Sequence, residues 1–266
     1  GLPHPALPRI QGGYNIIVNG IGGAGVITVG AILGMAAHLE SRGCSVLDNT
    51  GIARKGGAVS THVRLALRLE DLHGTRVADG AANLVIGGDL VVTAEPASLA
   101  KIARGLTRVV LNADAVPTLN QRLDPDGRLD EEPLMRALEA ATGEGGLQTV
   151  HATEIAERLL GDAIYANMLL LGFAWQRGAV PISLAAIERA NELNANAVDT
   201  NRRAFGIGRL AAHDPAVVAC AIAPAADPGV RMPAQMDLDE LVASRAAFLS
   251  DYQDAALARR YRDLVE

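Results

Sequence analysis

The feature that most constrains the fold is a connection of only eight residues between two predicted strands. Residues 45–49 (SVLDN) have the composition of a strand, and residues 58–69 alternate apolar and polar side chains over twelve positions. That alternation is typical of a strand with one buried face and one solvent-facing side. A crossover between parallel strands needs a dozen or more residues, so residues 50–57 cannot form one. The strand at 58–69 is therefore predicted to run antiparallel to the strand before it.

The rest of the chain, to about residue 213, alternates apolar runs with turn signals at the spacing of an α/β fold. Helix 25–41 is apolar nearly all round, and its Gly30 and Gly34 lie four residues apart, so we expect it to be buried and to approach a sheet closely. The prediction is a Rossmann-like three-layer α/β/α fold whose mostly parallel sheet is interrupted by the antiparallel strand. Further strands are predicted at 15–19, 83–87, 108–112 and 147–151, and helices at 130–143, 153–160, 163–177 and 183–212.

Proline and charge patterns divide the chain into four parts. Residues 1–12 contain three prolines and are predicted to form an arm, and residues 13–215 form the α/β domain. Residues 216–236 are rich in Pro, Ala, Asp and Gly, which favours a linker. Residues 237–266 are charged and helical in pattern and carry three aromatic side chains. We expect this helical extension to begin a further region; the alternative is a helix that folds back on the α/β domain.

Composition excludes several classes of function. A formal charge of −6 argues against binding nucleic acid or anionic lipid by bulk charge. Cys44 and Cys220 lie 176 positions apart, so this chain alone holds no Cys₄ iron–sulfur centre, structural zinc or disulfide framework. No apolar run reaches ~18 residues, so no membrane span is expected. We expect a cytoplasmic protein without a metal site of its own, and no catalytic triad is evident, so catalytic residues stay unknown.

A glycine-rich turn links the first predicted strand to the first helix. Gly20, Gly22, Gly23 and Gly25 match G-x-G-x-x-G in the context that binds dinucleotides, where backbone N–H groups and a helix N-terminus attract an anion. Asp48, however, follows Gly20 by 28 residues, later than the usual ribose-binding acid. The antiparallel strand also interrupts the place where the ribose pocket would be completed. Two interpretations stay open: an NAD(P)-binding module, or a tight turn without a nucleotide.

The loop between the second and third strands is cationic and glycine-rich. Lys55, Gly56 and Gly57 follow Arg54, a combination suited to a phosphate or carboxylate, although a solvated hairpin loop has the same composition. On the next strand, His62 and Arg64 share a polar face with Ser60. That face could bind an anion or a partner's acidic groups, or it could be the solvent side of the sheet.

Asparagines mark the late helices. Asn191, Asn194 and Asn201 fall on one stripe of the predicted helix 183–212, and Asn167 lies on the helix before it. Because asparagine is a poor helix former, the stripe suggests an interface with backbone or amide partners. The alternative is a helix whose asparagines face water.

Three segments together resemble a known family. GIGGAGVITVGAILGMAAHLE, LDNTGIARKGGAVSTHVR and NMLLLGFAWQRGAVP are similar to the γ domain of 2-oxoacid:ferredoxin oxidoreductases, most of all the fused indolepyruvate:ferredoxin oxidoreductases. The likeness covers roughly residues 14–212. The residues 248–266 are similar to the start of the region that follows this domain in the fused enzymes.

The resemblance implies a role in the oxidative decarboxylation of an aryl 2-oxoacid to its acyl-CoA, with ferredoxin as electron acceptor. It implies that thiamine diphosphate, Mg²⁺ and iron–sulfur clusters are held by other domains or subunits, and that this chain is inactive alone and part of an oligomer. The γ domain would help form the side of the active site that takes coenzyme A and substrate. The residues to which the resemblance assigns binding are Gly20, Gly22, Gly23, Gly25, Lys55, Gly56, Gly57, His62 and Arg64. A purely structural docking domain is the alternative.

Overall fold

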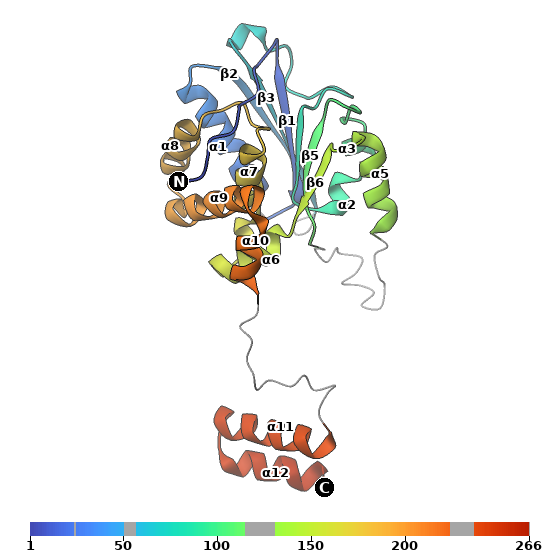
Figure 1. The fold of residues 1–266 in the computed structure, drawn as a ribbon, viewed down its shortest axis with the longest axis vertical. Coiled ribbons are helices and arrows are strands. Elements are labelled where there is room, and N and C mark those ends of the chain that lie inside the picture. Colours follow the sequence, from blue (N-terminus) through green and yellow to red (C-terminus); the bar gives the residue numbers. More distant parts are fainter. Residues whose placement is uncertain (24, 51–56, 115–130, 224–236, 266) are drawn as a thin grey trace. The chain divides into compact units, whose positions relative to one another are not determined.

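The computed structural model describes residues 1–23, 25–50, 57–114, 131–223 and 237–265. The chain divides into two compact units, residues 1–222 and 223–266 (Figure 1). The first holds the α/β fold and the second holds two helices. In the described parts of both units, every helix is too short or too polar to cross a membrane.

The first unit is built on a six-stranded sheet with the order β2-β3-β1-β4-β5-β6. Strand β3 is antiparallel to both of its neighbours, and β1, β4, β5 and β6 are mutually parallel. This confirms the mostly parallel sheet with one antiparallel strand, and β3 lies between β1 and β2. The strands are β1 (Tyr14–Ile21), β2 (Gly43–Thr50), β3 (Ala58–Ala66), β4 (Leu84–Gly87), β5 (Arg108–Asn112) and β6 (Leu147–Val150).

Strand β3 is shorter than predicted. It ends at Ala66 rather than residue 69, because Leu69–Asp71 forms a short 3₁₀ helix, η1. Leu67 and Leu69 are exposed, so their place in the alternating pattern does not reflect burial. The pattern therefore located the strand correctly and its end incorrectly.

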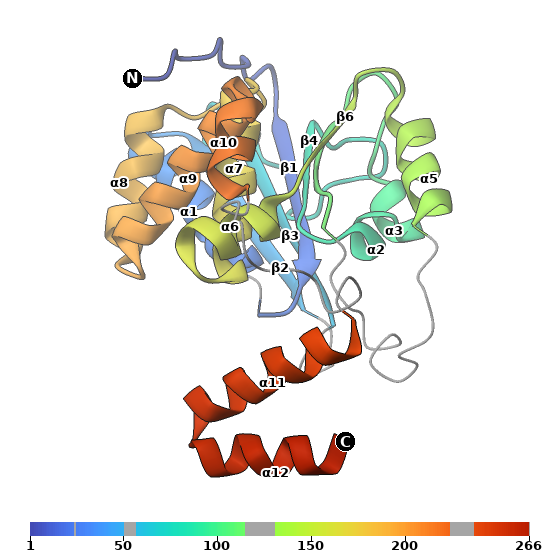
Figure 2. The ribbon, with the colours of Figure 1, turned by 60° about the horizontal axis from the view of Figure 1, so that its bottom comes forward.

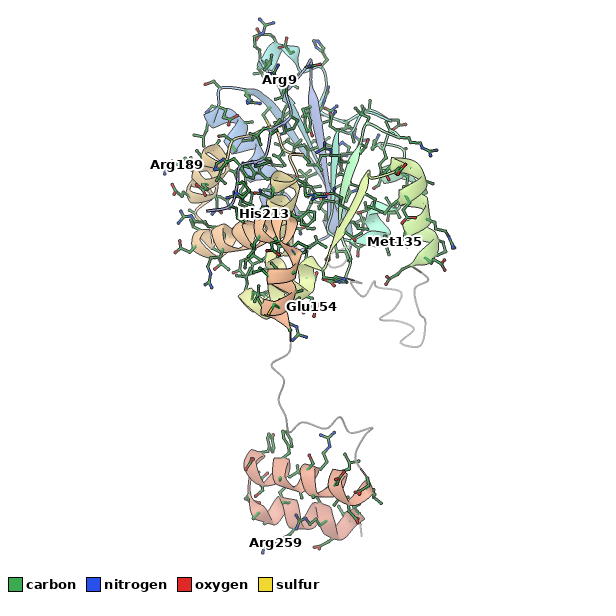
Figure 3. All side chains as sticks on the ribbon, viewed as in Figure 1. Arg9, Met135, Glu154, Arg189, His213 and Arg259 are labelled. Carbon is green, nitrogen blue, oxygen red and sulfur yellow. The ribbon has the colours of Figure 1, made fainter. Side chains whose placement is uncertain are left out.

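Helices cover both faces of the sheet (Figures 1 and 2). On one face α1 (Val26–Leu39) and α7 (Ala166–Gln176) contact the strands, and α8 (Leu184–Asn194) and α9 (Val198–His213) pack against these two helices. The other face carries α2 (Leu90–Thr93), α3 (Pro96–Leu99) and α5 (Glu132–Thr142). Side chains fill the space between these layers (Figure 3). The remaining helices of this unit are α6 (Ala152–Leu160), the 3₁₀ helix η2 (Ala163–Tyr165) and α10 (Pro215–Ile222).

Helix α1 approaches the sheet through its glycines, as predicted. A Cβ atom added to Gly34 would lie 2.9 Å from Cγ2 of Val46, and one added to Gly30 would overlap the Thr61 side chain. The expected burial of this helix holds on one side only. Ile27, Met35 and Leu39 lie on its exposed side, because only one face meets the sheet and α8.

The predicted helix 183–212 is two helices. Ala195 and Ala197 adopt left-handed backbone angles, with φ of 55° and 44°, which end α8 and begin α9. Asn191 donates to the carbonyl of Val198 (2.8 Å) and Asn201 to that of Asn196 (2.9 Å). Asn191 and Asn201 therefore bond to backbone, as their stripe suggested, but that backbone belongs to the break between α8 and α9, and Asn194 is exposed.

Two boundaries differ from the sequence prediction. Residues 216–222, predicted as the start of a linker, belong to helix α10, which starts at Pro215 and buries Val218 within the first unit. Helix α5 begins at Glu132 with Pro133 in its first turn, and Gly143 follows its last residue. Asp130, predicted as its cap, lies outside the described residues.

The second unit confirms the helical extension. Helices α11 (Leu238–Tyr252) and α12 (Ala255–Val265) pack against each other and bury Ala246 and Ala258. Phe248 and Tyr252 stack with ring centroids 6.3 Å apart, and both are exposed.

Candidate functional site

The glycine turn lies where the sequence predicted it, between β1 and α1. Gly23 and Gly25 adopt φ of 95° and 85°, a left-handed conformation that favours glycine. Gly25 is the N-cap of α1, and a Cβ atom added to Gly20 would lie 2.7 Å from Cγ2 of Val26. The turn therefore needs glycine at these positions for its own geometry, whether or not it binds a ligand.

The turn is bonded to the end of the β2–β3 connection. The N–H of Gly22 donates to the carbonyl oxygen of Gly57 at 2.9 Å. The two glycine motifs therefore meet at one edge of the sheet. Lys55 and Gly56, the other predicted binding residues of that connection, lie outside the described residues, as does Arg54.

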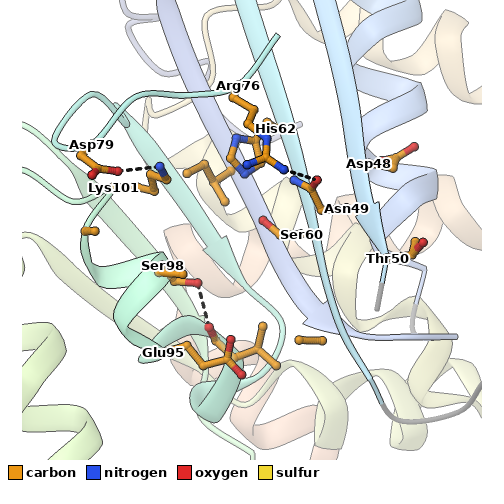
Figure 4. Close-up of a pocket in the computed structure, with 15 residues that line it drawn as sticks. Asp48, Asn49, Thr50, Ser60, His62, Arg76, Asp79, Glu95, Ser98 and Lys101 are labelled. Atoms are coloured by element: carbon orange, nitrogen blue, oxygen red, sulfur yellow. Dashed lines mark hydrogen bonds and ion pairs between the residues drawn. The ribbon is translucent and has the colours of Figure 1, made fainter. Parts of the chain in front are cut away.

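A cavity of about 680 Å³ lies beside this edge (Figure 4). Thr61 contacts α1, so the neighbouring residues Ser60 and His62 point to the opposite face of the sheet, where the cavity lies. Thr50 and Ala58, on either side of the β2–β3 connection, also line it. Its lining carries both signs of charge: the cations Arg76 and Lys101 and the carboxylates Asp48, Asp79 and Glu95 lie there with the neutral polar side chains of Asn49, Ser60, His62 and Ser98.

His62 is not on a solvent-facing side. Its side chain is only 7 % exposed, and its Nδ1 accepts a hydrogen bond from the backbone N–H of Val77 at 3.0 Å. Burial, together with the nearby cations Lys101 and Arg76, lowers the pKa of His62. The ring is therefore held neutral, and because Nδ1 accepts a hydrogen bond, its proton lies on Nε2.

Arg64 does not line the cavity but holds the segment that covers β3. Its Nη1 donates to the carbonyls of His73 and Gly74, the latter at 2.7 Å, and its Nε donates to Oδ1 of Asn15 at 3.2 Å. The polar face of β3 is thus covered by the chain that leads from η1 to β4. This corrects the expectation of a wet face, whereas the binding role that the resemblance assigns to Arg64 stays a prediction.

Sequence reasoning missed the two cations of the cavity. Nη2 of Arg76 lies 3.5 Å from Oδ1 of Asn49, and Nζ of Lys101 lies 2.6 Å from Oδ1 of Asp79. Neither cation belongs to a recognisable motif, and Arg76 and Lys101 follow Lys55 by 21 and 46 positions. Composition offered a signal for Lys101 alone, since Lys55 and Lys101 are the only lysines in the sequence.

The geometry beside α1 disfavours a dinucleotide. Because β3 separates β1 from β2, Asp48 lies one strand further from the glycine turn than in a dinucleotide fold, and it accepts a hydrogen bond from Thr61 at 2.5 Å. A cavity of about 120 Å³ beside Gly25 is lined by Thr28, Asn167 and Asn201 among others. That volume is below the roughly 300–1,000 Å³ of sites for drug-sized ligands.

A second polar cluster lies at the carboxyl ends of β5 and β6. One oxygen of Asp114 lies 2.7 Å from Nδ1 of His151, and the other accepts the backbone N–H of Glu154 at 2.8 Å. Candidate ligand atoms of these three residues lie within 4.8 Å of one another. The hydrogen bonds already use both oxygens of Asp114 to fix the start of α6.

Comparison with known proteins gives the same family as the motifs. Residues 15–211 match the family described as pyruvate ferredoxin/flavodoxin oxidoreductase. The indolepyruvate oxidoreductase subunit IorB of Methanothermobacter thermautotrophicus is 32 % identical over 198 residues, which cover 73 % of this chain and 95 % of the relative. The subunit of the same name from Archaeoglobus fulgidus is 27 % identical over 201 residues, covering 73 % and 92 %.

Solved structures share the fold. The pyruvate oxidoreductase subunit PORC of Thermotoga maritima superposes with a TM-score of 0.53 at 20 % identity, covering 74 % of this chain and 95 % of that one. The 2-oxoglutarate:ferredoxin oxidoreductase of Magnetococcus marinus gives 0.56 at 17 % identity, covering 76 % of this chain and 31 % of that one. The resemblance drawn from the sequence motifs is confirmed, and the chain belongs to the pyruvate ferredoxin/flavodoxin oxidoreductase family.

Proposed function

We propose that this chain is the γ component of a 2-oxoacid:ferredoxin oxidoreductase that acts on indolepyruvate or another aryl pyruvate. The observation that carries the proposal is the hydrogen bond from Gly22 to Gly57, because it joins the two motifs of the resemblance beside a polar cavity. The names of the curated relatives support indolepyruvate as the substrate class. The reaction would convert the oxoacid to its acyl-CoA and pass electrons to ferredoxin.

In this proposal the redox cofactors are bound by other subunits or domains. Thiolates are the ligands of iron–sulfur clusters, and the chain has only Cys44 and Cys220. Burial raises the pKa of Cys44 to about 11, which disfavours its thiolate. The chain therefore does not fit an iron–sulfur site. Thiamine diphosphate and its Mg²⁺ would likewise be held by the partners, where they supply the decarboxylation chemistry.

The contribution of this chain would be to form the side of the active site that takes coenzyme A and substrate. The backbone at Gly22 and Gly57 would set the position of the cationic connection, and Lys55 would attract the phosphates or carboxylate of the incoming molecule. In the alternative, a purely structural docking domain, Lys55 has no role in the affinity of the enzyme for coenzyme A or the oxoacid.

The test is reconstitution of the whole oxidoreductase with its partner subunits or domains. We expect indolepyruvate- and coenzyme A-dependent reduction of ferredoxin by the complex, and none by this chain alone. Lys55→Ala should raise the KM for coenzyme A or for the oxoacid roughly 10- to 150-fold, the loss of one charge-assisted contact of ~1.5–3 kcal/mol. Arg68→Ala is the matched control, since Arg68 is exposed and, within the described part of the chain, its ion pairs are with its near neighbours Glu70 and Asp71.

Two results would contradict the proposal. Turnover by the isolated chain would refute the division of labour, and unchanged KM values in Lys55→Ala would leave the structural docking domain as the explanation. A titration with NADH, followed by nicotinamide fluorescence, checks the remaining alternative. Saturable binding that Gly22→Val abolishes would favour an NAD(P)-binding module instead.

A further inference from the structure

A largely apolar cavity of about 430 Å³ lies beside β6, the edge strand of the sheet. Its walls come from β6, α6, α7, α9 and α10, whose arrangement can be followed in Figure 1. The buried side chains of Ile155, Phe173 and Val218 belong to these walls. Because protein interiors are close-packed, apolar walls around an open space favour an apolar occupant.

The space is open because small side chains stand where α9 and α10 border it. Ala211 and Ala212 lie near the end of α9, and Ala219 lies on α10. Leucine or phenylalanine at these positions would fill the cavity, so its existence is a property of this sequence. Its volume falls within the roughly 300–1,000 Å³ of sites for drug-sized ligands, enough for a bicyclic ring.

A cation without a carboxylate partner lines this cavity. Arg177 directly follows α7, and its Nε donates to Oε1 of Gln148, a neutral amide, at 3.0 Å. In the part of the chain that the structure describes, no carboxylate lies within 4.0 Å of the Arg177 guanidinium. Arg108 adds a second cation here, since its Nη1 donates to the carbonyls of Arg177 and Gly178, both at 3.1 Å. This part of the cavity therefore favours an anionic group.

The carboxylates near the cavity already have cationic or polar partners. Glu154 lines the cavity, and its Oε1 lies 3.3 Å from Nε of Arg158. Asp114 bonds to Nδ1 of His151 at 2.7 Å, and His151 also lines the cavity. The charges of these acids are thus offset locally, whereas the charge of Arg177 is not. The cavity therefore combines apolar walls with one available cation.

We propose that this cavity binds an aromatic carboxylate, with the carboxylate at Arg177 and the ring among Ile155, Phe173 and Val218. The Nη groups of a guanidinium are donors that suit a carboxylate. The ring of Phe173 favours an aromatic ring over an alkyl chain, because aromatic pairs gain from edge-to-face or offset contacts. This cavity lies on the face of the sheet that α7 covers, opposite to the cavity beside His62, so the inference does not depend on the proposed function.

Fluorine NMR of 5-fluoroindole-3-acetate, a bicyclic aromatic carboxylate, tests the proposal on the full chain. The fluorine line should broaden saturably as protein is added. The neutral 5-fluoroindole-3-acetamide should bind roughly five- to tenfold more weakly, because it keeps the ring and loses a charge-assisted contact that water partly screens. Unlabelled indole-3-acetate should displace the probe at lower concentration than octanoate does. Equal or better displacement by octanoate would overturn the choice of an aromatic ligand.

Variants of Arg177 test the role of the cation. Arg177→Gln should weaken binding of the acid to about the affinity of the amide, and Arg177→Lys should restore part of it because the charge returns. Arg177 is exposed, so both variants are expected to fold. Arg189→Gln is the matched control, since Arg189 is an exposed arginine of α8 that pairs with Glu192, and it should leave binding unchanged.

Variants of α10 test the place of binding. Ala219→Phe should abolish binding by filling the cavity, whereas Ala216→Phe should not, because Ala216 lies on the same helix outside the cavity lining. Both alanines are exposed, so neither variant disturbs buried packing. A nitroxide attached to the exposed Cys220, next to Ala219, should further broaden the line of the bound probe, and reduction of the nitroxide should reverse this.

The outcomes separate this inference from the proposed function. An absence of saturable broadening, or the same broadening in Ala219→Phe as in the parent, overturns the site even if the reconstituted oxidoreductase is active. Equal binding of the acid and the amide overturns the carboxylate and the role of Arg177. Loss of binding in the reconstituted complex would mean that a partner covers the cavity, which also overturns a ligand site. Binding that persists in a complex without turnover of indolepyruvate supports this inference and contradicts the proposed function alone.

Discussion

Replacing Gly208 by alanine should destabilise the protein, although alanine is the better helix former. Helices α7 and α9 approach each other at Gly172 and Gly208. A Cβ atom added to Gly208 would collide with the carbonyl oxygen of Leu169 and lie 2.8 Å from its carbon and 2.9 Å from the nitrogen of Phe173. All three are backbone atoms of α7, so no side chain can rotate away and the helices must separate.

The magnitude follows from two opposing effects. Alanine gains about 1 kcal/mol over glycine within a helix. Overpacking a well-packed interior costs about 1–3 kcal/mol, occasionally more, and a collision with backbone lies at the upper end. We therefore expect Gly208→Ala to lower the free energy of unfolding by about 2 kcal/mol. Gly206 provides the control on the same helix, because a Cβ atom there meets nothing within 4 Å. Gly206→Ala should stabilise by up to about 1 kcal/mol.

Urea unfolding followed by tryptophan fluorescence measures both variants. Trp175 is the only tryptophan, lies on α7 and is buried, and its ring centroid is 6.2 Å from that of Phe205 on α9. Its signal therefore reports the packing of these two helices. The reasoning is refuted if Gly208→Ala is as stable as the parent, or if the two alanine variants shift the urea midpoint in the same direction.

Three further outcomes are expected. Burial raises the pKa of Cys44 to about 11, so at pH 8 Cys44 should react with a thiol reagent about 100-fold more slowly than an ordinary thiol. The exposed Cys220 should react first. A fast phase that survives in Cys220→Ser would contradict this. Ala195→Gly should raise the free energy of unfolding in urea by about 1 kcal/mol, because Ala195 is exposed and has a left-handed backbone conformation at the end of α8. Unchanged stability would argue against backbone strain at this residue. The pKa of His62 is lowered in the folded protein, so as pH falls below about 6.5 the unfolded chain binds a proton at this residue more readily than the folded one. The free energy of unfolding should therefore decrease from pH 7.5 to 5.5, and it should decrease by less in His62→Gln. An equal decrease in the two proteins would refute the assignment to His62.

The parts of the fold that the sequence predicted correctly depend on short stretches of chain. The direction of β3 followed from the length of one connection, and the glycine turn followed from a strand and a helix on either side of it. The direction of β3 and the position of the glycine turn both depend on the geometry of a short stretch of chain, which a single sequence is enough to predict. The meeting of Gly22 and Gly57 could be expected because both residues adjoin the same edge of the sheet.

The parts that failed depend on what packs against an element. Alternation along β3 indicates two faces but not what covers each, so His62 was grouped with solvent-facing side chains although residues 73–77 cover it. The break at Ala195 carries no glycine or proline signal, because alanine ordinarily favours a helix; the amides of Asn191 and Asn201 stabilise it from outside. Arg76 and Lys101 line the cavity because folding places them there, and neither belongs to a periodic pattern or a motif in the sequence.

The reversed direction of β3 has a consequence for how this architecture can diversify. In an all-parallel sheet each strand offers only its final residues to the edge where ligands bind, whereas a strand running the opposite way presents its first residues there. The hairpin between β2 and β3 can therefore change in length and chemistry at that edge while the register of both strands, paired from Gly43 with Ala66 to Thr50 with Val59, stays intact. Related enzymes could thus acquire different ligand preferences by substitution in one hairpin, with the helix that begins at the glycine turn left untouched.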